Sequence, residues 1–479
     1  MYTLSIFLIV IGVILLAVYI YDKNQKSHSL LRNFPLVGRT RWIAEWLRPK
    51  IVQYFVESDI NGKPISREIR SLVYQRSKNE TDKVPFGTKH DLYKPGAEWF
   101  GHIHKESVPV AINRIKIGSN LCSQPYESSL INSSAMSYGA LGKNAILAIG
   151  KGAKLAGFAQ NTGEGGLSEY HLENGNDIIF QMGTGYFGCR DFAGYFNKDK
   201  FKVIANNPQV KMIEIKMSQG AKPGHSGILP ALKNTEEIAK IRGVKPFTEI
   251  LSPQTHSAFK TNIELLEFIN NLRGLSNGKP IGIKMCIGNP NEFKELTQAM
   301  QNMQMYPDFI TIDSGDGGTG AAPLEFANNV GFPLIDALAF VDNDLKLKGL
   351  RKNIKIIASG KIFTGFDILK ALCVGADLIN SARGMMLSLG CLQALQCHLN
   401  ICPVGIATTD PKYMRGLDVD DKAKRIYNYH TNTIKATTEL MQAIGVSKTE
   451  YLNRSLLYRR MYDNSIKSYD ILYPDNFKL

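Results

Sequence analysis

Three cysteines near the C-terminus share one short segment, CLQALQCHLNICPVG. Cys391, Cys397 and Cys402 are spaced C-x5-C-x4-C, and a proline follows the last of them. Three thiolates exceed what a nucleophile and its base require, and they fall one short of the usual structural zinc set. The spacing therefore predicts an iron–sulfur cluster with three cysteine ligands. Two alternatives are a structural zinc site completed by His398 and neutral cysteines packed in a helix, although Cys391 and Cys397 are not one helical turn apart.

Two lysines, Lys216 and Lys284, lie inside the apolar runs IEIKMS and IGIKMC. Burial of an ammonium group is costly unless it meets an anion or strong acceptors. A reduced flavin is electron-rich along N1 and O2 of its ring, and a cation at that edge stabilises the developing charge. We therefore expect both lysines to contact a flavin. The alternative is that they extend to solvent at a rim.

Two glycine-containing loops could hold a phosphate. ASGK (358–361) and NSARG (380–384) combine small residues with free backbone N–H groups, which can bind a phosphate group. The loops after the last two strands of a β/α barrel are its recurring phosphate location. Tight turns, which also need glycine, are the alternative. The prediction is a phosphorylated cofactor held by these loops, with contacts from Gly360, Ala382, Arg383 and Gly384.

Eight short apolar runs must position these residues. Each run ends in polar or small residues and is followed by a segment of helical length, and the runs begin at residues 129, 157, 177, 211, 280, 308, 354 and 377. Eight β/α alternations in roughly 270 residues match a TIM barrel, which typically takes about 250. A doubly wound open sheet is the rival, but it usually has fewer strands and opens on a G-x-G-x-x-G turn that is absent here. We predict an α/β TIM barrel whose site is built from the carboxyl ends of its strands.

The N-terminal run TLSIFLIVIGVILLAVYIY (3–21) is uncharged, and about 20 apolar residues suffice to cross a bilayer. It predicts a transmembrane helix; a signal peptide is the alternative, although no basic stretch precedes the run and no small-x-small cleavage site follows it. The basic residues after it predict a single-pass anchor with the catalytic domain in the cytoplasm. RTRWIAEWLRPK (39–50) interleaves tryptophan with cations, as a segment on anionic lipid does, and a solvated basic linker is the alternative.

Length, composition and charge set the remaining limits. The 479 residues are 44% hydrophobic, enough for a large core. The seven cysteines, an odd number, favour reduced, cytosol-facing thiols over a disulfide framework. We attribute part of the net charge of +14 to basic residues that face a membrane. Nucleic-acid binding is not expected, since no nucleic-acid module is recognisable. The predicted organisation is an anchor at 1–22, a juxtamembrane and N-terminal extension at 23–127, the barrel with the cysteine segment at 128–415, and a helical extension at 416–479.

Several motifs resemble, in the same order, the synthase domain of the glutamate synthase family. CHLNICPVGIAT (397–408) is similar to the family's cluster segment, and only Ile401 departs from its core pattern. The other matches are AMSYGALG, NTGEGG, QMGTGYFG, IKMSQGAKPG, SPQTH and SGDGGTGAAP, followed by the two phosphate loops. The resemblance implies a TIM barrel that carries FMN and a three-iron, four-sulfur (3Fe-4S) cluster. The family's glutaminase and β-helical domains are not expected in this chain, so free ammonia or a separate subunit would supply nitrogen.

The resemblance also implies a reaction. Electrons from ferredoxin or a reductase subunit would enter through the cluster and reduce FMN, and hydride would then pass to an imine of a small 2-oxo acid and ammonia. With 2-oxoglutarate the product would be L-glutamate. Glu164 would handle ammonia or a proton, with a surface glutamate in a tight glycine turn as the alternative, while Lys222 and Arg190 would bind the substrate carboxylate. Contacts to the cofactor are expected from Ser137, Gln181, Lys216, Lys284, Ser314 and Gly315, with Asp313 orienting the site.

Two departures from the family pattern concern the substrate. Tyr186 stands where the family has an arginine that would bind a dicarboxylate, and His225 and Ser226 replace a Glu-Gly pair. Arg190 could compensate for the missing arginine. The alternatives are therefore a membrane-tethered FMN and iron–sulfur oxidoreductase that acts on another substrate, and a non-catalytic redox relay subunit.

Overall fold

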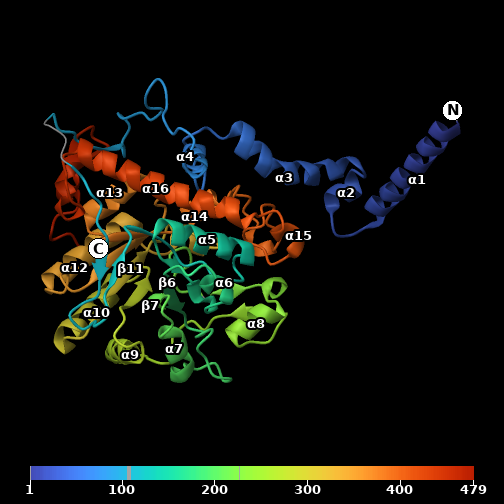
Figure 1. Cartoon of the computed structure of the whole chain (residues 1–479). Helices are drawn as coiled ribbons and strands as arrows, with labels where there is room; N and C mark the ends of the chain where they lie inside the picture. The colour runs from blue at the N-terminus through green and yellow to red at the C-terminus, as the bar shows by residue number, and fades with distance from the viewer. Residues whose placement is uncertain (1, 105–108, 226) are drawn as a thin grey trace. The chain divides into compact units, whose positions relative to one another are not determined.

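The computed structural model describes residues 2–104, 109–225 and 227–479 (Figure 1). The chain divides into two compact units, residues 1–70 and 71–479. The first unit contains helices α1 (Tyr2–Asn24), α2 (Ser29–Asn33) and α3 (Thr40–Ile51), and helix α4 (Arg67–Lys78) crosses the boundary. The second unit contains a closed barrel and the elements that cover it.

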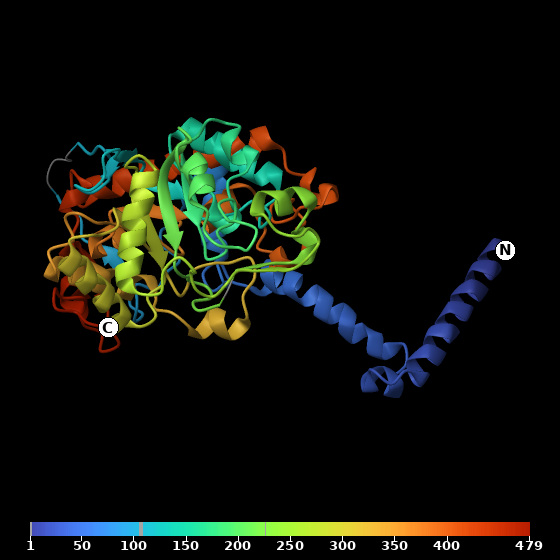
Figure 2. The ribbon, with the colours of Figure 1, turned by 90° about the horizontal axis from the view of Figure 1, so that it is seen from below.

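Helix α1 is the candidate membrane span. It contains the predicted run 3–21, it is long and apolar enough to cross a bilayer, and its apolar window is not buried in the protein. A signal sequence near the N-terminus would meet the same criteria. Figure 2 shows α1 and α3 as separate helices that diverge from the short turn containing α2. The topology of this segment stays a prediction.

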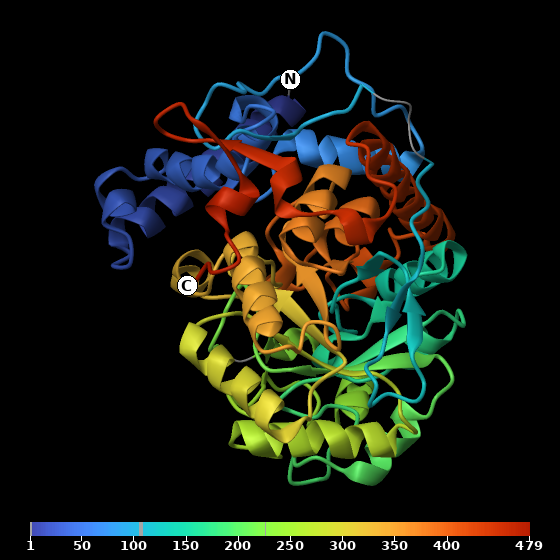
Figure 3. The same cartoon turned by 90° about the vertical axis from the view of Figure 1, so that its left-hand side faces the viewer.

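Eight parallel strands close into the barrel, which confirms the predicted α/β TIM fold. Each strand overlaps one of the eight predicted runs, and its side chains are almost all buried, because a parallel barrel strand is covered on both faces. Figure 3 shows helices surrounding the strands. In barrel order the strands are β4 (Ile131–Ser133), β5 (Gln160–Asn161), β6 (Ile178–Met182), β7 (Val210–Lys216), β10 (Ile281–Met285), β11 (Phe309–Asp313), β12 (Lys355–Ser359) and β13 (Leu378–Ser381).

Side chains at the first turn determine where helices around the barrel begin. Thr261 and Glu264 form a capping box at one helix, and Thr364 and Asp367 form another, so that side chains satisfy backbone N–H groups of the first turn. These caps fix where each helix begins after its strand. The principal covering helices are α5 (Lys143–Ala156), α7 (Lys198–Ala205), α9 (Asn262–Leu275), α10 (Pro290–Met303), α12 (Leu334–Leu347), α13 (Gly365–Val374) and α14 (Arg383–Ser388).

The connection from β7 to α9 is a long excursion with structure of its own. It contains an antiparallel hairpin of β8 (Ile228–Leu229) and β9 (Ile250–Leu251), with helix α8 (Glu236–Arg242) between the two strands. Because the excursion leaves the carboxyl end of β7, it lies at the end of the barrel where catalytic residues are found in this fold.

The C-terminal segment differs from the predicted helical extension. The long helix α16 (Val419–Ala443) packs against α5 and α13, as expected. Strands β14 (Leu457–Arg460) and β15 (Ile466–Ser468) follow it and form an antiparallel sheet with β1 (Glu98–Phe100). Strands of three or four residues have too short an alternation to be recognised from sequence. The domain boundaries themselves stay predictions.

Candidate functional site

Two predicted site lysines lie side by side at the carboxyl ends of β7 and β10. Lys216 and Lys284 are register partners on these neighbouring strands, and both are buried. Lys216 Nζ donates to Glu164 Oε1 at 2.5 Å, and Lys284 Nζ lies 3.6 Å from Asp313 Oδ2. Each ammonium therefore meets a carboxylate, which offsets the cost of burying it, and neither extends to solvent. Their contact with a flavin stays a prediction.

Glu164 is placed by the turn that follows β5. It lies in the 3-10 turn Gly163–Gly165 with 18% of its side chain exposed, so it is not a surface glutamate. Gly183 and Gly227 approach it so closely that a Cβ at either position would collide with the carboxylate. Burial opposes ionisation, but three neighbouring cations outweigh it and hold the pKa of the Glu164 carboxyl below its usual value: Lys216, Arg242 and Lys284.

Arg242 is a site residue that the sequence analysis missed. It ends α8, is 4% exposed, and places its guanidinium 5.2 Å from the ring centre of Phe187. Its Nη2 donates to Tyr138 O at 3.2 Å and to Ser137 Oγ at 3.4 Å, and its buried Nε has no hydrogen-bond partner. Burial lowers its pKa to about 10, against the opposing effect of Glu164. An arginine at a helix C-terminus ordinarily complements the helix dipole, so its position in the sequence gave no signal of this role.

The two residues predicted to bind carboxylate have different surroundings. Lys222 is 3% exposed, and burial, followed by the nearby Lys216, lowers its pKa to about 8. Arg190 is not brought into this cluster: its guanidinium lies 5.7 Å from the ring centre of Phe187, and its side chain runs beside Gly243. Within the described ranges, no hydrogen bond or ion pair joins the Arg190 side chain to the cluster residues Glu164, Lys216 and Lys222.

Tyr186 does not present its hydroxyl to the site. Its side chain is fully buried, and its hydroxyl lies 3.0 Å from His256 Nδ1 and accepts the Ala258 N–H at 3.1 Å. His256 Nε2 is 2.9 Å from the carbonyl of Lys216, which can only accept, so Nε2 carries the proton and Nδ1 accepts from Tyr186. Burial lowers the pKa of His256 to about 4, in keeping with a neutral ring. Tyr186 therefore supports the backbone of Lys216 through His256, and the effect of this departure on the substrate stays a prediction.

The second departure from the family pattern is described only in part. The ring of His225 lies 5.3 Å from that of Phe326, and Ser226 lies outside the described residues.

Gln181 is tied to a buried carboxylate inside the barrel. Its Nε2 donates to Glu214 Oε2 at 2.6 Å. Asn161 Nδ2 donates to the same oxygen at 2.9 Å, and Thr311 Oγ1 donates to Oε1 at 2.6 Å. The network fixes Gln181 at the end of β6 with its NH₂ group directed at Glu214. Its amide oxygen is the group left for a cofactor.

The predicted phosphate loops meet after β11, β12 and β13. Gly360 has φ +149° and packs against the hydroxyl of Ser314, where a Cβ would collide. Ser314 Oγ and Asn380 Oδ1 are buried without hydrogen-bond partners. Arg383 donates from Nη2 to Asp316 O at 3.1 Å, and burial lowers its pKa. A buried hydroxyl without a partner and a half-buried guanidinium beside glycine backbone suit a phosphate group.

The other residues assigned to these loops contribute mainly backbone. A Cβ at Gly315 would collide with the backbone of Gly331, and Gly384 lies against the hydroxyls of Tyr429 and Ser381. Ala382 caps the short helix α14. Asp313 accepts from Gly220 N–H at 3.1 Å and from Ser359 Oγ at 3.2 Å, so it joins the ends of three elements. Its role in orienting the site stays a prediction.

The three cysteines line one small cavity after α14. Burial, and in addition the neighbouring Cys397 and Cys402, raise the pKa of Cys391 to about 11. Only Cys397 lies in a helical turn, so cysteines packed in one helix are excluded. His398, the fourth ligand of the zinc alternative, is exposed. Across residues 2–104, 109–225 and 227–479, no three His, Cys, Asp or Glu side chains are arranged to hold a metal ion, so the cluster stays a prediction.

The backbone of the cysteine segment is unusual. Gln393, Leu395 and Asn400 have φ values of 56°, 56° and 61°. A non-glycine residue with positive φ is uncommon, and for a bulky residue such as leucine it is a genuine outlier that costs free energy. Such conformations gather at ligand sites, where they aim several side chains at one point.

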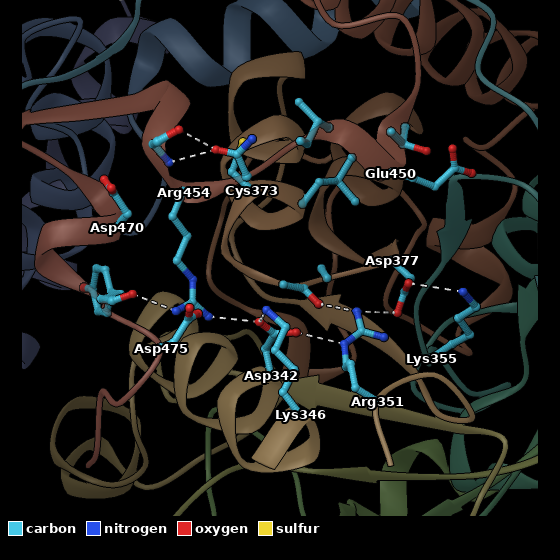
Figure 4. A pocket seen from close by; sticks show the side chains of 18 of the residues that line it. Asp342, Lys346, Arg351, Lys355, Cys373, Asp377, Glu450, Arg454, Asp470 and Asp475 are labelled. Atoms are coloured by element: carbon cyan, nitrogen blue, oxygen red, sulfur yellow. Dashed lines mark hydrogen bonds and ion pairs between the residues drawn. The ribbon is translucent and has the colours of Figure 1, made fainter. Parts of the chain in front are cut away.

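The opposite end of the barrel holds a cavity of about 710 Å³ (Figure 4). Its cations are paired with acids: Asp342 contacts Lys346, Arg351 and Arg454, and Arg351 also reaches Asp377. Lys355 and Asp377 lie at the amino ends of β12 and β13. The cavity is also lined by Glu450, Asp470 and Asp475, so its cations are not in excess. This face of a TIM barrel ordinarily serves stability.

Comparisons with known proteins identify the family to which the chain belongs. The family model described as "Conserved region in glutamate synthase" matches residues 74–447. The glutamate synthase large subunit-like protein YerD of Bacillus subtilis (strain 168) is 40% identical over 507 aligned positions, which cover 97% of this chain and 96% of that protein. The archaeal glutamate synthase (NADPH) of Methanocaldococcus jannaschii is 33% identical over 364 positions, 75% of this chain and 67% of that protein.

Two further comparisons set the limits of the likeness. The archaeal-type glutamate synthase (NADPH) of Thermotoga maritima is 34% identical over 326 positions, and the match covers 67% of this chain and only 61% of that protein. Among solved structures, a variant flavocytochrome b2 with sulfite bound is 12% identical with a TM-score of 0.45, covering 91% of this chain and 92% of that one. A likeness at this level carries no information about function.

Proposed function

Because the chain belongs to the glutamate synthase family, we propose that it is an FMN-dependent oxidoreductase that forms L-glutamate from 2-oxoglutarate and ammonia. The observation that carries the proposal is the charge at the carboxyl end of the barrel. Four buried cations, Lys216, Lys222, Arg242 and Lys284, lie with two carboxylates, Glu164 and Asp313. Buried cations in excess call for an anionic ligand, and a dicarboxylate brings two negative charges.

Arg242 and Lys222 are the proposed carboxylate contacts. In the described part of the chain, neither has a carboxylate within ion-pair distance, and Arg242 Nε is without a hydrogen-bond partner. A guanidinium binds a carboxylate through parallel N–H groups, and such charge-assisted bonds are the strong ones. Arg242 supports 2-oxoglutarate as the substrate, because it places an arginine beside Glu164 although Tyr186 occupies the family's arginine position.

Glu164 is the proposed proton carrier. Ionised beside Lys216, it can take a proton from ammonium, which leaves ammonia to attack the 2-oxo carbon and form an imine with loss of water. Glu164 then returns that proton to the imine nitrogen as hydride arrives at carbon, so one proton and one electron pair are delivered. Lys216 keeps the carboxylate ionised and oriented between these steps.

The phosphate loops are the proposed binding site for FMN. Ser314 and Arg383 would hold its phosphate, since Ser314 offers a buried hydroxyl that lacks a partner and Arg383 offers a half-buried guanidinium. Gln181 and Lys284 would contact its ring. FMN supplies the hydride chemistry when it is bound.

Cys391, Cys397 and Cys402 are the proposed ligands of a three-iron, four-sulfur cluster that receives electrons from ferredoxin or a reductase subunit. Their common cavity and the left-handed residues between them support this role. Purified protein should contain iron and acid-labile sulfide in excess over flavin, and Cys397→Ser should remove the cluster absorption while FMN stays bound. Stoichiometric zinc without iron would overturn the assignment.

Helix α1 is the proposed single-pass anchor, which would hold the barrel on the cytoplasmic side. The basic residues that follow it support this orientation. A reporter fused after Leu479 should score as cytoplasmic.

An anaerobic assay of the full-length protein with 2-oxoglutarate, ammonium and reduced ferredoxin tests the proposal. We expect glutamate to accumulate in proportion to the ferredoxin oxidised. Turnover only with another 2-oxo acid would favour the alternative substrate, and ferredoxin oxidation without any amination would favour a redox relay.

A further inference from the structure

Helix α3 exposes apolar surface that folding does not explain. None of its residues is buried, and Trp42 and Trp46 are 41% and 65% exposed. The helix continues into a π-helical turn, Val52–Val56, whose Phe55 is 84% exposed. Large exposed aromatic side chains that cluster on one short segment mark an interaction surface.

The residues of α3 divide into two faces. Trp42, Ile43, Trp46 and Leu47 recur at i, i+1, i+4 and i+5, which places them on one side of a helix. Arg41, Glu45 and Arg48 recur at i, i+4 and i+7 on the other side. A basic polar face opposite a tryptophan-containing apolar face is the pattern of a helix that lies in a membrane interface.

Lys50 lies on the apolar side of α3, one turn after Trp46, at the C-terminal edge of that face. Its Nζ lies 3.3 Å from the ring centre of Trp46, a cation–π contact. A lysine at the edge of an apolar face can extend its amine to the phosphate level while its methylenes and the indole stay in the apolar layer.

An ion pair fixes where α3 begins relative to α1. Asp22, near the end of α1, has no exposed surface and accepts Arg39 Nη2 at 2.6 Å and Arg39 Nε at 2.9 Å. Its Oδ2 also accepts the N–H of Leu36 at 3.1 Å. This two-bond contact ties the chain just before α3 to the end of the apolar helix. If α1 crosses a bilayer, α3 therefore starts at the surface where the span ends.

We propose that α3 lies in the cytoplasmic interface of a bilayer that contains anionic phospholipid. The Trp42 and Trp46 face occupies the boundary between headgroups and acyl chains, and the cations contact lipid phosphates. The inference rests on the anchor proposed for α1. The charge supports an anionic surface, because seven Lys and Arg residues at positions 22–50 oppose two acids, Asp22 and Glu45.

The tryptophan content makes a direct test possible. The chain has three tryptophans, and two of them are in α3. The full-length Trp99→Phe variant is reconstituted into vesicles of phosphatidylcholine alone, or with phosphatidylglycerol, in each case with brominated acyl chains. With the anionic lipid we expect a blue shift and loss of about half or more of the emission, because indoles at the acyl boundary contact the quencher. Acrylamide in the aqueous phase should quench these residues weakly.

Two matched variants complete the test. The full-length Trp42→Phe, Trp46→Phe protein keeps only Trp99, on strand β1, and should not be quenched by brominated lipid. Replacing Arg41, Arg48 and Lys50 by glutamine should reduce the quenching in anionic vesicles toward that in phosphatidylcholine alone.

Flotation of the same vesicles separates the possible failures. Protein that floats with its vesicles but shows acrylamide-accessible, unquenched Trp42 and Trp46 would overturn the interfacial role while leaving the α1 anchor intact. Equal quenching in both lipids would overturn the anionic preference. Protein that does not float would overturn both the anchor and this inference, and none of these readouts depends on glutamate formation.

Discussion

The two ends of the barrel are both rich in buried charge, yet they use it differently. At the amino end, Asp342 and Asp377 each contact more than one cation, and Arg351 bridges them. At the carboxyl end, Glu164 has Lys216 as its direct partner, while Lys222 and Arg242 add positive charge that no carboxylate in the described chain matches.

This difference distinguishes buried charges that pair with each other and stabilise the fold from buried charges that are available to a ligand. A buried ion pair contributes little net stability, but removing one partner leaves an uncompensated charge and is costly. A buried cation without a partner already bears that cost in the folded protein, so its removal should harm binding and not folding. We therefore assign a structural role to the cavity at the amino end, although it is larger than the cavity lined by the three cysteines.

The largest expected effect is at Arg242. Arg242→Gln should lower kcat/KM for 2-oxoglutarate roughly 100-fold or more, because a charged hydrogen-bonded contact is worth about 3 kcal/mol. The free energy of unfolding should stay the same or rise. Arg190→Gln is the matched control, since Arg190 contacts the same Phe187 ring from outside the cluster, and steady-state kinetics with urea denaturation measure both variants. A larger loss in Arg190→Gln would reverse the assignment.

The corresponding substitution at the amino end should act on stability. Arg351→Met leaves Asp377 with Lys355 and removes one of the three cations at Asp342, so the free energy of unfolding should fall by about 2–3 kcal/mol while kcat/KM of the folded enzyme is unchanged. Lys346→Met is the control, because the Lys346 side chain is 51% exposed and its ion pair should contribute less than about 1 kcal/mol. Lost activity in folded Arg351→Met would show that this end takes part in function.

Lys222 should give the site a pH dependence. Its pKa is lowered to about 8, so its charge is lost as pH rises through that value, and KM for 2-oxoglutarate should increase about tenfold per pH unit above it. Stability should change in the opposite direction: the unfolded chain binds the proton up to the usual pKa of 10.5, so the Lys222 contribution to stability rises with pH between the two values. Lys222→Met should abolish both trends, and a pH-independent KM in the wild type would exclude Lys222 from carboxylate binding.

The smallest expected effect is at Tyr186. Tyr186→Phe removes the hydroxyl contacts to His256 and the Ala258 N–H, which should cost about 1 kcal/mol of stability. Thermal unfolding and kinetics measure the variant. Since the hydroxyl does not face the site, kcat/KM should change by no more than about twofold. A loss on the scale expected for Arg242 would return Tyr186 to the substrate site.

The barrel could be predicted because a short, contiguous stretch of sequence identifies each of its strands. Each strand is a short apolar run ending in polar residues, and Lys216, Lys284 and Asp313 are fixed by the strands that carry them. The phosphate loops were predictable for the same reason, because they directly follow β12 and β13.

Two contacts that the sequence analysis did not foresee are made with the excursion after β7. Arg242 reaches Ser137 through the fold of α8 against the barrel, and Tyr186 contacts His256 from a loop distant in sequence. Neither hydrophobic periodicity nor motif spacing in the sequence indicates which residues make such contacts. Arg190 was favoured because it is close in sequence to Tyr186, whereas the arginine beside Glu164 is in a different loop.

Ligand binding to the oxidised, full-length enzyme tests most directly whether the unmatched cations at the carboxyl end bind a dicarboxylate. Isothermal titration with 2-oxoglutarate is compared with titration of 2-oxobutyrate, which lacks the second carboxylate. The account predicts that 2-oxoglutarate binds roughly 100-fold more tightly, a difference of about 3 kcal/mol for one charged contact, and that Arg242→Gln or Lys222→Met removes most of this preference. Equal affinity for the two acids, or a preference that survives both substitutions, would contradict it.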